Sequence, residues 1–268
     1  MSAVGVVGAG RAGIAVARAL SAAGHSVHLH GRREHTVLPP LVASWGDKVP
    51  WLSQVDVVLV AVPDGVIAQV ASRLPVTAQH TVLHLAGPVG PEALAPLRDS
   101  GASLGALHPL LGLRGAATDP AMFCGAIAAL DGDERALAVG RALATSLGMV
   151  PVVVPGPLRA RYHAGAVFAA NYLVTLAAVA ERLMVESGVP QDVARRGVVR
   201  LMESSLANVA EAGPAAALTG PIARGDVETI QRHLEALTGL DQKLYRVLGK
   251  MTARSAGAVA RGVTDALE

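Results

Sequence analysis

The pattern of apolar and polar positions changes once along the chain. From residue 3 to residue 154, short apolar runs without polar alternation are separated by segments with a helical period. Such runs indicate strands buried on both faces, which is typical of a parallel sheet covered by helices on both sides. The predicted strands are Ala3–Val7, Ser26–His30, Val55–Val62, Thr81–Leu85, Ser103–Leu107, Phe123–Leu130 and Val150–Val154.

After Pro155-Gly156-Pro157 the β-branched runs end, and only the helical period continues. We therefore expect an α/β domain over residues 1–155 and an all-α domain over residues 156–268, with Asp226 as an N-cap in the second domain. The helices predicted for the first domain are Arg11–Ala23, Gly65–Leu74, Pro91–Asp99 and Asp133–Leu147. Those predicted for the second are Leu158–Ser187, Gln191–Glu211, Val227–Leu237 and Leu240–Leu267.

A glycine-rich turn links the first predicted strand to the first helix. In a G-x-G-x-x-G turn of this kind, the glycines permit a tight turn, close approach to a pyrophosphate, and packing of the helix on the strand. The phosphates would lie at the positive N-terminal end of the helix. A glycine-rich turn without a ligand is the alternative, but the strand–turn–helix context favours a Rossmann dinucleotide-binding domain. The residues of the turn are Gly8, Ala9, Gly10, Arg11, Ala12 and Gly13.

The end of the second predicted strand bears on the choice of dinucleotide. Sites that prefer NAD place an acid there for the ribose hydroxyls, whereas this chain has Arg32 and Arg33. Guanidinium groups suit a 2′-phosphate, so the sequence predicts NADP(H), with Arg32 preferred over Arg33. The alternative is that both are solvated loop charges. Val62, Pro63 and Ala86 follow two further strand ends and are expected to border the cofactor.

Reduction of a carbonyl or imine by hydride needs a proton donor and polar groups that orient the substrate. His108 follows the strand Ser103–Leu107, and the long helix carries His163, Asn171 and Thr175 on one face at multiples of four residues. These residues are predicted to line a pocket. Two alternatives remain: a hydrogen bond of His108 to a turn carbonyl, and a hydrogen bond of Asn171 between helices.

The loop before Asp226 adds two tentative substrate residues. Thr219 offers a hydroxyl, and Arg224 offers a guanidinium that would clamp a carboxylate, a role open also to Arg114. An ion pair of Arg224 with Asp226 or Glu228 is an equally fair interpretation.

Composition narrows the classes of function. Hydrophobic residues make up 51% of the chain and charged residues 16%, which is typical of a globular protein. The basic residues are scattered, so no nucleic-acid partner is predicted. Cys124 is the single cysteine and no metal-binding motif occurs, so we expect no disulfide, no metal and a reducing cytoplasm. The apolar stretch Ala164–Ala180 contains Asn171 and Thr175, which favours a buried helix of a soluble protein over a membrane span.

The chain resembles a bacterial Rossmann-like family whose C-terminal helical domain has no known function. The matching stretches are GVVGAGRAG, VAVPD, HLAG, ALHPL, RYHAGAVFAANYLVTL and ALTGPIARGD, which span nearly the whole chain. This family is similar to ketopantoate reductases, β-hydroxyacid dehydrogenases and pyrroline-5-carboxylate reductases. The resemblance implies a nicotinamide site between the two domains and a homodimer formed through the helical domain.

One departure from these relatives affects the mechanism. The catalytic helix of ketopantoate reductases and β-hydroxyacid dehydrogenases carries a lysine one turn before an asparagine. The asparagine position matches Asn171, but the lysine position falls on Val167. His163 or His108 would have to supply the proton instead.

The sequence therefore predicts an NADPH-dependent reductase of a small carbonyl compound, with a 2-oxo acid such as ketopantoate as the first candidate. A cyclic imine reductase is a second hypothesis, and a non-catalytic NADP(H)-binding sensor, which the missing lysine would suit, is a third.

Overall fold

The structure is a computed structural model that describes residues 2–34, 37, 39, 41–255 and 261–268. The chain forms two compact units, Met1–Asn171 and Tyr172–Glu268. The predicted domain boundary at residue 155 directly precedes helix α4 (Gly156–Val167), which belongs to the first unit.

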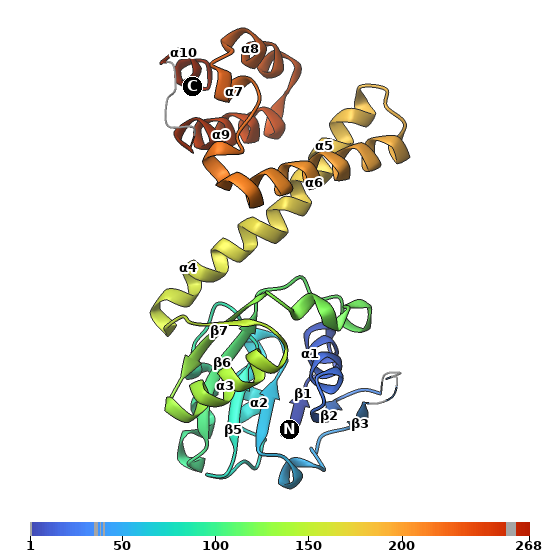
Figure 1. Cartoon of the computed structure of the whole chain (residues 1–268), viewed down its shortest axis with the longest axis vertical. Helices are drawn as coiled ribbons and strands as arrows, with labels where there is room; N and C mark the ends of the chain where they lie inside the picture. The colour runs from blue at the N-terminus through green and yellow to red at the C-terminus, as the bar shows by residue number, and fades with distance from the viewer. Residues whose placement is uncertain (1, 35–36, 38, 40, 256–260) are drawn as a thin grey trace. The chain divides into compact units, whose positions relative to one another are not determined.

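Among the described residues, eight strands form one sheet in the order β3-β2-β1-β4-β5-β6-β7-β8 (Figure 1). Its first six positions have the order 3-2-1-4-5-6 of doubly wound dinucleotide-binding folds. Neighbouring strands are parallel except β6 and β7, which are antiparallel. The strands are β1 (Ala3–Val7), β2 (Ser26–Gly31), β3 (Val42–Trp45), β4 (Val57–Val60), β5 (Thr81–His84), β6 (Ser103–Pro109), β7 (Ile127–Gly132) and β8 (Val150–Val153).

The predicted fold class is confirmed, with corrections inside the sheet. The sequence does not predict β3, because this edge strand is short and only partly buried and lacks an apolar run. The prediction of a wholly parallel sheet is wrong at β7. Its predicted start is also wrong, since Phe123 ends a 3-10 turn, Pro120–Phe123, and is buried there instead. Strand β4 is shorter than predicted because the chain leaves the sheet at Ala61 to line the cavity described below.

Helices cover both faces of the sheet in the first unit. One apolar core joins the strands to α1 (Arg11–Ala22) and α3 (Glu134–Ser146). The other joins them to α2 (Ile67–Ala71) and to η3 (Pro91–Ser100), a 3-10 helix with a proline inside where an ordinary helix is predicted. Each fully buried aliphatic side chain contributes roughly 1.5–3 kcal/mol to such cores. These two cores hold the carboxyl ends of the parallel strands in fixed positions.

The predicted long helix is continuous but not buried. It consists of α4, a π-helical turn at Phe168–Tyr172 and α5 (Leu173–Glu186). By length and composition it is able to cross a membrane, and none of its most apolar part is buried within the chain. The prediction of a helix buried in its own domain is therefore wrong. Helix α5 packs on α6 (Gln191–Ala216), which leaves the rest of its small, apolar side chains uncovered.

The helical unit has a small apolar core of its own. Helix α6 is kinked at Gly213, which has a φ of 77° and directly precedes Pro214. Asp226 accepts a hydrogen bond from the Thr229 amide at 3.1 Å, which confirms its prediction as an N-cap. The remaining helices are α7 (Pro221–Arg224), α8 (Val227–Ala236), α9 (Gly239–Ser255) and α10 (Arg261–Ala266). Part of the predicted helix 240–267 lies at residues 256–260, outside the described residues.

Candidate functional site

The glycine-rich turn lies between β1 and α1, as its sequence context predicts. Gly8 has a φ of +119°, and a Cβ at this position would collide with the carbonyl oxygen of Ala61. Only glycine lets β1 turn so close to the end of β4. A Cβ on Gly13 would collide with the Gly8 carbonyl, whereas one on Gly10 would meet no atom within 4 Å. The turn therefore packs tightly against the protein and leaves its Gly10 side open.

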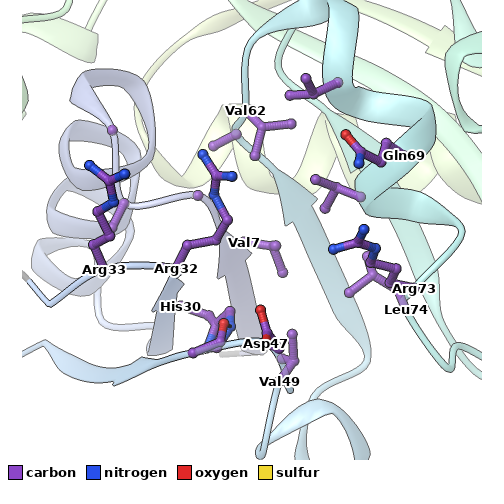
Figure 2. Close-up of a pocket in the computed structure, with 18 of the residues that line it drawn as sticks. Val7, His30, Arg32, Arg33, Asp47, Val49, Val62, Gln69, Arg73 and Leu74 are labelled. Atoms are coloured by element: carbon purple, nitrogen blue, oxygen red, sulfur yellow. Dashed lines mark hydrogen bonds between the residues drawn. The ribbon is translucent and has the colours of Figure 1, made fainter.

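A cavity of about 410 Å³ lies at this turn (Figure 2). Its size is within the range of small-molecule sites, and it lies where the strand order reverses between β1 and β4, the position at which such sheets bind ligands. Arg11, Ala12 and Gly13 form the first turn of α1, and Ala86 lies beyond β5. The predicted cofactor residues that line the cavity are Gly8, Ala9, Gly10, Arg32, Arg33, Val62 and Pro63.

The cavity also contains residues that the sequence does not single out. Arg73, just after α2, and Asp47, just after β3, line it together with the predicted arginines. Figure 2 shows Arg32 and Arg73 on opposite sides of the cavity, with Arg33 on the far side of Arg32 from Arg73. No motif marks Arg73 or Asp47, and Asp47 reaches the cavity only through the unpredicted strand β3. The cavity is thus positively charged, with one acid in its wall.

These features fit an anionic dinucleotide. At the N-terminus of α1, Gly10 makes no side-chain cap and the first turn holds no acid. The free amide groups and the positive helix end would therefore face a pyrophosphate without competition. The exposed guanidinium groups of Arg32 and Arg33 would bind a further phosphate next to it.

A second polar cluster lies at the ends of β5 and β6, on the same edge of the sheet. His108 Nδ1 is 3.1 Å from the Tyr162 hydroxyl, and the two rings meet edge to face. The His163 ring is also edge-on to His108, with centroids 5.8 Å apart. Both histidines lie over Gly87: a Cβ there would collide with the His163 ring and lie 3.0 Å from His108 Nε2. The structure thus brings together two of the predicted catalytic residues.

Arg159 lies on α4, one turn before Tyr162, and has no exposed surface. Its guanidinium donates to the Ala86 carbonyl at 3.0 Å and, at a longer 3.5 Å, to the Val154 carbonyl, while its Nε has no hydrogen-bond partner. Burial lowers the pKa of this guanidinium, an effect that the charges of Asp131, Tyr162 and Glu92 partly offset. A buried cation bonded to carbonyls exerts its charge on its neighbours, because no solvent screens it.

The histidines respond to this environment. Burial, followed by the charges of His163, Arg159 and His84, lowers the pKa of His108 to about 4. Burial also lowers the pKa of His84, which accepts from the Ala86 amide and lies 2.8 Å from the Gly90 carbonyl. Burial raises the pKa of Tyr162, and the charge of Arg159 opposes that rise. At neutral pH, His108 is therefore an uncharged imidazole beside a protonated phenol.

The other predicted site residues belong to elements outside these two clusters. Asn171 is exposed in the π-helical turn at the end of the first unit. Thr219 and Arg224 belong to the helical unit, where Arg224 ends α7 and Glu228 pairs with Arg232. Within the described residues, no group of three or more His, Cys, Asp or Glu side chains is placed to hold a metal ion.

Comparison with protein families assigns both parts of the chain. Residues 3–86, which contain the glycine turn and the arginines, match the family described as NADP oxidoreductase, coenzyme F420-dependent. Residues 126–252 match a domain of unknown function, DUF2520. The chain thus matches an NADP oxidoreductase domain in its first part and a DUF2520 domain in its second. The resemblance to a Rossmann-like family with an uncharacterised helical domain is therefore confirmed, as is NADP(H) as the cofactor. A comparison with curated proteins finds no match.

Solved structures share the fold of this oxidoreductase over nearly its whole length. A protein from Bacteroides fragilis has a TM-score of 0.76 at 20% identity, with 94% of this chain and 98% of that chain covered. Pyrroline carboxylate reductase of Plasmodium falciparum with NADP bound has a TM-score of 0.66 at 11% identity, with 100% and 98% covered. The pyrroline-5-carboxylate reductase of Streptococcus pyogenes has a TM-score of 0.63 at 16% identity, with 99% and 98% covered. At these identities the similarity shows the fold alone.

Proposed function

We propose that the protein is an NADPH-dependent reductase of a small carbonyl compound, with a 2-oxo acid such as ketopantoate as the first candidate substrate. One observation carries this proposal: His108, Tyr162 and His163 meet at the sheet edge that also carries the arginine-lined cavity. A dinucleotide held by its phosphates at one end of that edge extends along the strand ends towards the other. The cluster then supplies polar groups where hydride transfer needs them.

The residues divide into three roles in this proposal. The turn Gly8–Gly13 binds the pyrophosphate, Arg32 and Arg33 bind the 2′-phosphate, and Val62, Pro63 and Ala86 border the cofactor. Bound NADPH supplies the hydride. The proton comes from the cluster that contains His108 and His163, while Asn171 holds the reacting oxygen. Thr219 and Arg224 bind the substrate, with the guanidinium on its carboxylate.

Reduction of a cyclic imine is the second candidate. The neighbours named as pyrroline carboxylate reductases cover almost all of this chain, including its helical unit, which supports this alternative. An imine needs the same proton donor but no carboxylate clamp. A non-catalytic NADP(H) sensor is the third hypothesis, and it rests on Val167 at the position of the relatives' lysine.

The test is oxidation of NADPH, followed by its near-ultraviolet absorbance, against ketopantoate, other 2-oxo acids and cyclic imines. NADH serves as the parallel cofactor, and coenzyme F420 is included because the matching family is described by it. Turnover with a 2-oxo acid supports the first candidate, and turnover with an imine alone replaces it with the second. His163→Ala should abolish turnover and leave NADPH binding intact. No turnover, together with tight NADPH binding, would favour the sensor.

We also propose a homodimer formed through the helical unit, in a cytoplasmic protein. Large apolar side chains remain exposed on α5 and α6, with Val174 69% and Leu201 61% exposed. A second copy of this chain would cover them, since contiguous apolar surface is unfavourable in water. Leu201→Glu should shift the mass measured by light scattering from dimer to monomer. Val42→Glu, an exposed apolar position on edge strand β3, is the matched control and should remain dimeric.

A further inference from the structure

Tyr162 belongs to the polar cluster, where it contacts His108, yet the roles proposed above leave it unassigned. It is partly buried, its hydroxyl contacts His108 Nδ1 at 3.1 Å, and its ring packs edge-on against that imidazole. It lies on α4 directly before His163 and one turn after the buried Arg159. The cluster therefore holds one partly exposed phenol against an imidazole.

We infer that Tyr162 is the proton donor of the reduction, and that His108 is the positioning residue that holds its hydroxyl and returns its proton. The inference rests on the proposed reductase function and names which group of its site completes the reaction.

The geometry favours the phenol over the two histidines. A histidine donates as a strong acid only when it is an imidazolium. His108 is surrounded by Arg159, His84 and His163, and these cationic or potentially cationic neighbours disfavour a second proton on its ring. The His163 ring lies directly against Gly87, with its Cδ2 edge towards the backbone. Tyr162, in contrast, carries its proton at neutral pH.

The charge of Arg159 acts on the phenol in the direction that a donor needs. Burial raises the pKa of Tyr162, and Arg159 works against this rise. The same cation stabilises the phenolate that remains after transfer, because a buried positive charge attracts an anion that forms nearby. The chain thus places a buried cation one turn before its proton donor on the same helix.

Bound NADPH would supply a hydride and become NADP⁺. The hydride carries two electrons to the carbonyl carbon, where a carbon–hydrogen bond forms while the carbon–oxygen π bond breaks. The substrate oxygen takes the proton of the Tyr162 hydroxyl, which leaves an alcohol and a phenolate. The phenolate regains a proton from His108 Nδ1, while Nε2 of the same ring takes one from water. The net proton therefore comes from solvent, and His108 ends as the other neutral tautomer and returns to the first by exchange with water.

This step requires one particular tautomer of His108. Nδ1 must carry the proton and donate it to the Tyr162 oxygen, so that the hydroxyl hydrogen stays available to the substrate. In the opposite tautomer, the phenol donates to Nδ1 and is no longer free to donate elsewhere.

The chain offers a matched control for the substitution. In the helical unit, His233 Nδ1 is 2.9 Å from the Tyr245 hydroxyl, and the two rings meet at 86°, the same interplanar angle as His108 and Tyr162. This second pair joins α8 to α9 within that unit. Tyr245→Phe therefore removes the same kind of hydrogen bond without touching the cluster.

The experiment combines kinetics with nitrogen NMR of the free protein. Tyr162→Phe should lower kcat by about 100-fold or more, which is the usual contribution of a general acid, and leave KM for NADPH unchanged. Tyr245→Phe should keep the wild-type kcat. Long-range proton–nitrogen correlation should show the proton of His108 on Nδ1 in the wild type, and a mixture of tautomers in Tyr162→Phe.

The outcomes separate this inference from the proposed function. If the wild type turns over and Tyr162→Phe retains its kcat within about threefold, the inference is overturned and the reductase stands. If the wild type turns over no substrate, the proposed function fails. The position of the His108 proton then tests the arrangement separately, and a proton on Nδ1 supports a Tyr162 hydroxyl that is free to donate. A proton on Nε2 overturns the inference in either case.

Discussion

Two sets of arginines in the first unit lie in opposite environments. Arg32, Arg33 and Arg73 are exposed around the cavity at the glycine turn, and their guanidinium groups are accessible to a ligand there. Arg159 has no exposed surface, and its donors are directed at the carbonyls of Ala86 and Val154. The exposed guanidinium groups keep their donors for a ligand, whereas Arg159 directs its two terminal nitrogens at carbonyls of the protein.

Arginine therefore has two different roles along one edge of the sheet. The exposed set would contribute to binding, and removing it should change cofactor affinity. The buried arginine would contribute through its field, and removing it should change the protonation of His108 and Tyr162.

The largest effect is expected from the exposed set. The double variant Arg32→Ala and Arg33→Ala should raise KM for NADPH by about 100-fold, because charge-assisted bonds to a phosphate contribute about 3 kcal/mol together. KM for NADH should stay unchanged, since NADH has no 2′-phosphate. Steady-state kinetics with both cofactors check this, with Arg141→Ala on the exposed side of α3 as a control that should keep both values. An equal loss for both cofactors would contradict a phosphate-reading role.

The next effect is a pH dependence of stability that comes from the buried side. His108 binds a proton near pH 6.5 when unfolded but only near 4 when folded. Its contribution is therefore fully present above pH 6.5, and the free energy of unfolding falls as the pH drops towards 4, by at most about 1.4 kcal/mol per pH unit. Denaturant unfolding at several pH values should show a shallower acid loss in His108→Gln. Parallel curves for the two proteins would refute the lowered pKa of His108.

Arg159→Met should change both the stability of the protein and the pKa of His108. Loss of the guanidinium leaves the Ala86 and Val154 carbonyls without donors, so the free energy of unfolding should fall by about 2 kcal/mol. Loss of its charge should also raise the pKa of His108, which an NMR titration of the imidazole measures. Arg141→Met, the exposed counterpart, should change neither quantity.

The smallest effect is expected from Arg73. Because it lies on the opposite wall from Arg32, Arg73→Ala should weaken NADPH binding by only about three- to tenfold, the range of a single exposed charge contact. Titration calorimetry with NADPH measures this loss. A loss as large as that of the Arg32 and Arg33 double variant would make Arg73 the main phosphate ligand.

The local parts of this architecture follow from the sequence. The glycine turn, the strand ends and Arg32 lie within a few tens of residues of one another, so a strand–turn–helix pattern places them together. Cofactor type followed from the arginines after β2, and the family match confirms it.

The long-range parts do not follow from the sequence. Tyr162 meets His108, which is 54 positions earlier in the chain, and Arg159 meets the carbonyl of Ala86, which is 73 positions earlier. Arg159 follows a proline-glycine-proline stretch that predicts only the end of a domain. Burial of a charge depends on which distant carbonyls reach it, and no periodicity encodes that. The exposure of the long helix also could not be predicted, because an apolar helix has the same sequence pattern whether or not its own chain covers it.

Titration calorimetry at one salt concentration compares the affinity of the purified protein for NADPH with its affinity for NADH. NADPH should bind at least about tenfold more tightly, and Arg32→Ala should remove most of this difference. Equal affinities in the wild type, or tighter binding of NADH, would contradict the assignment of the arginine-lined cavity to a 2′-phosphate.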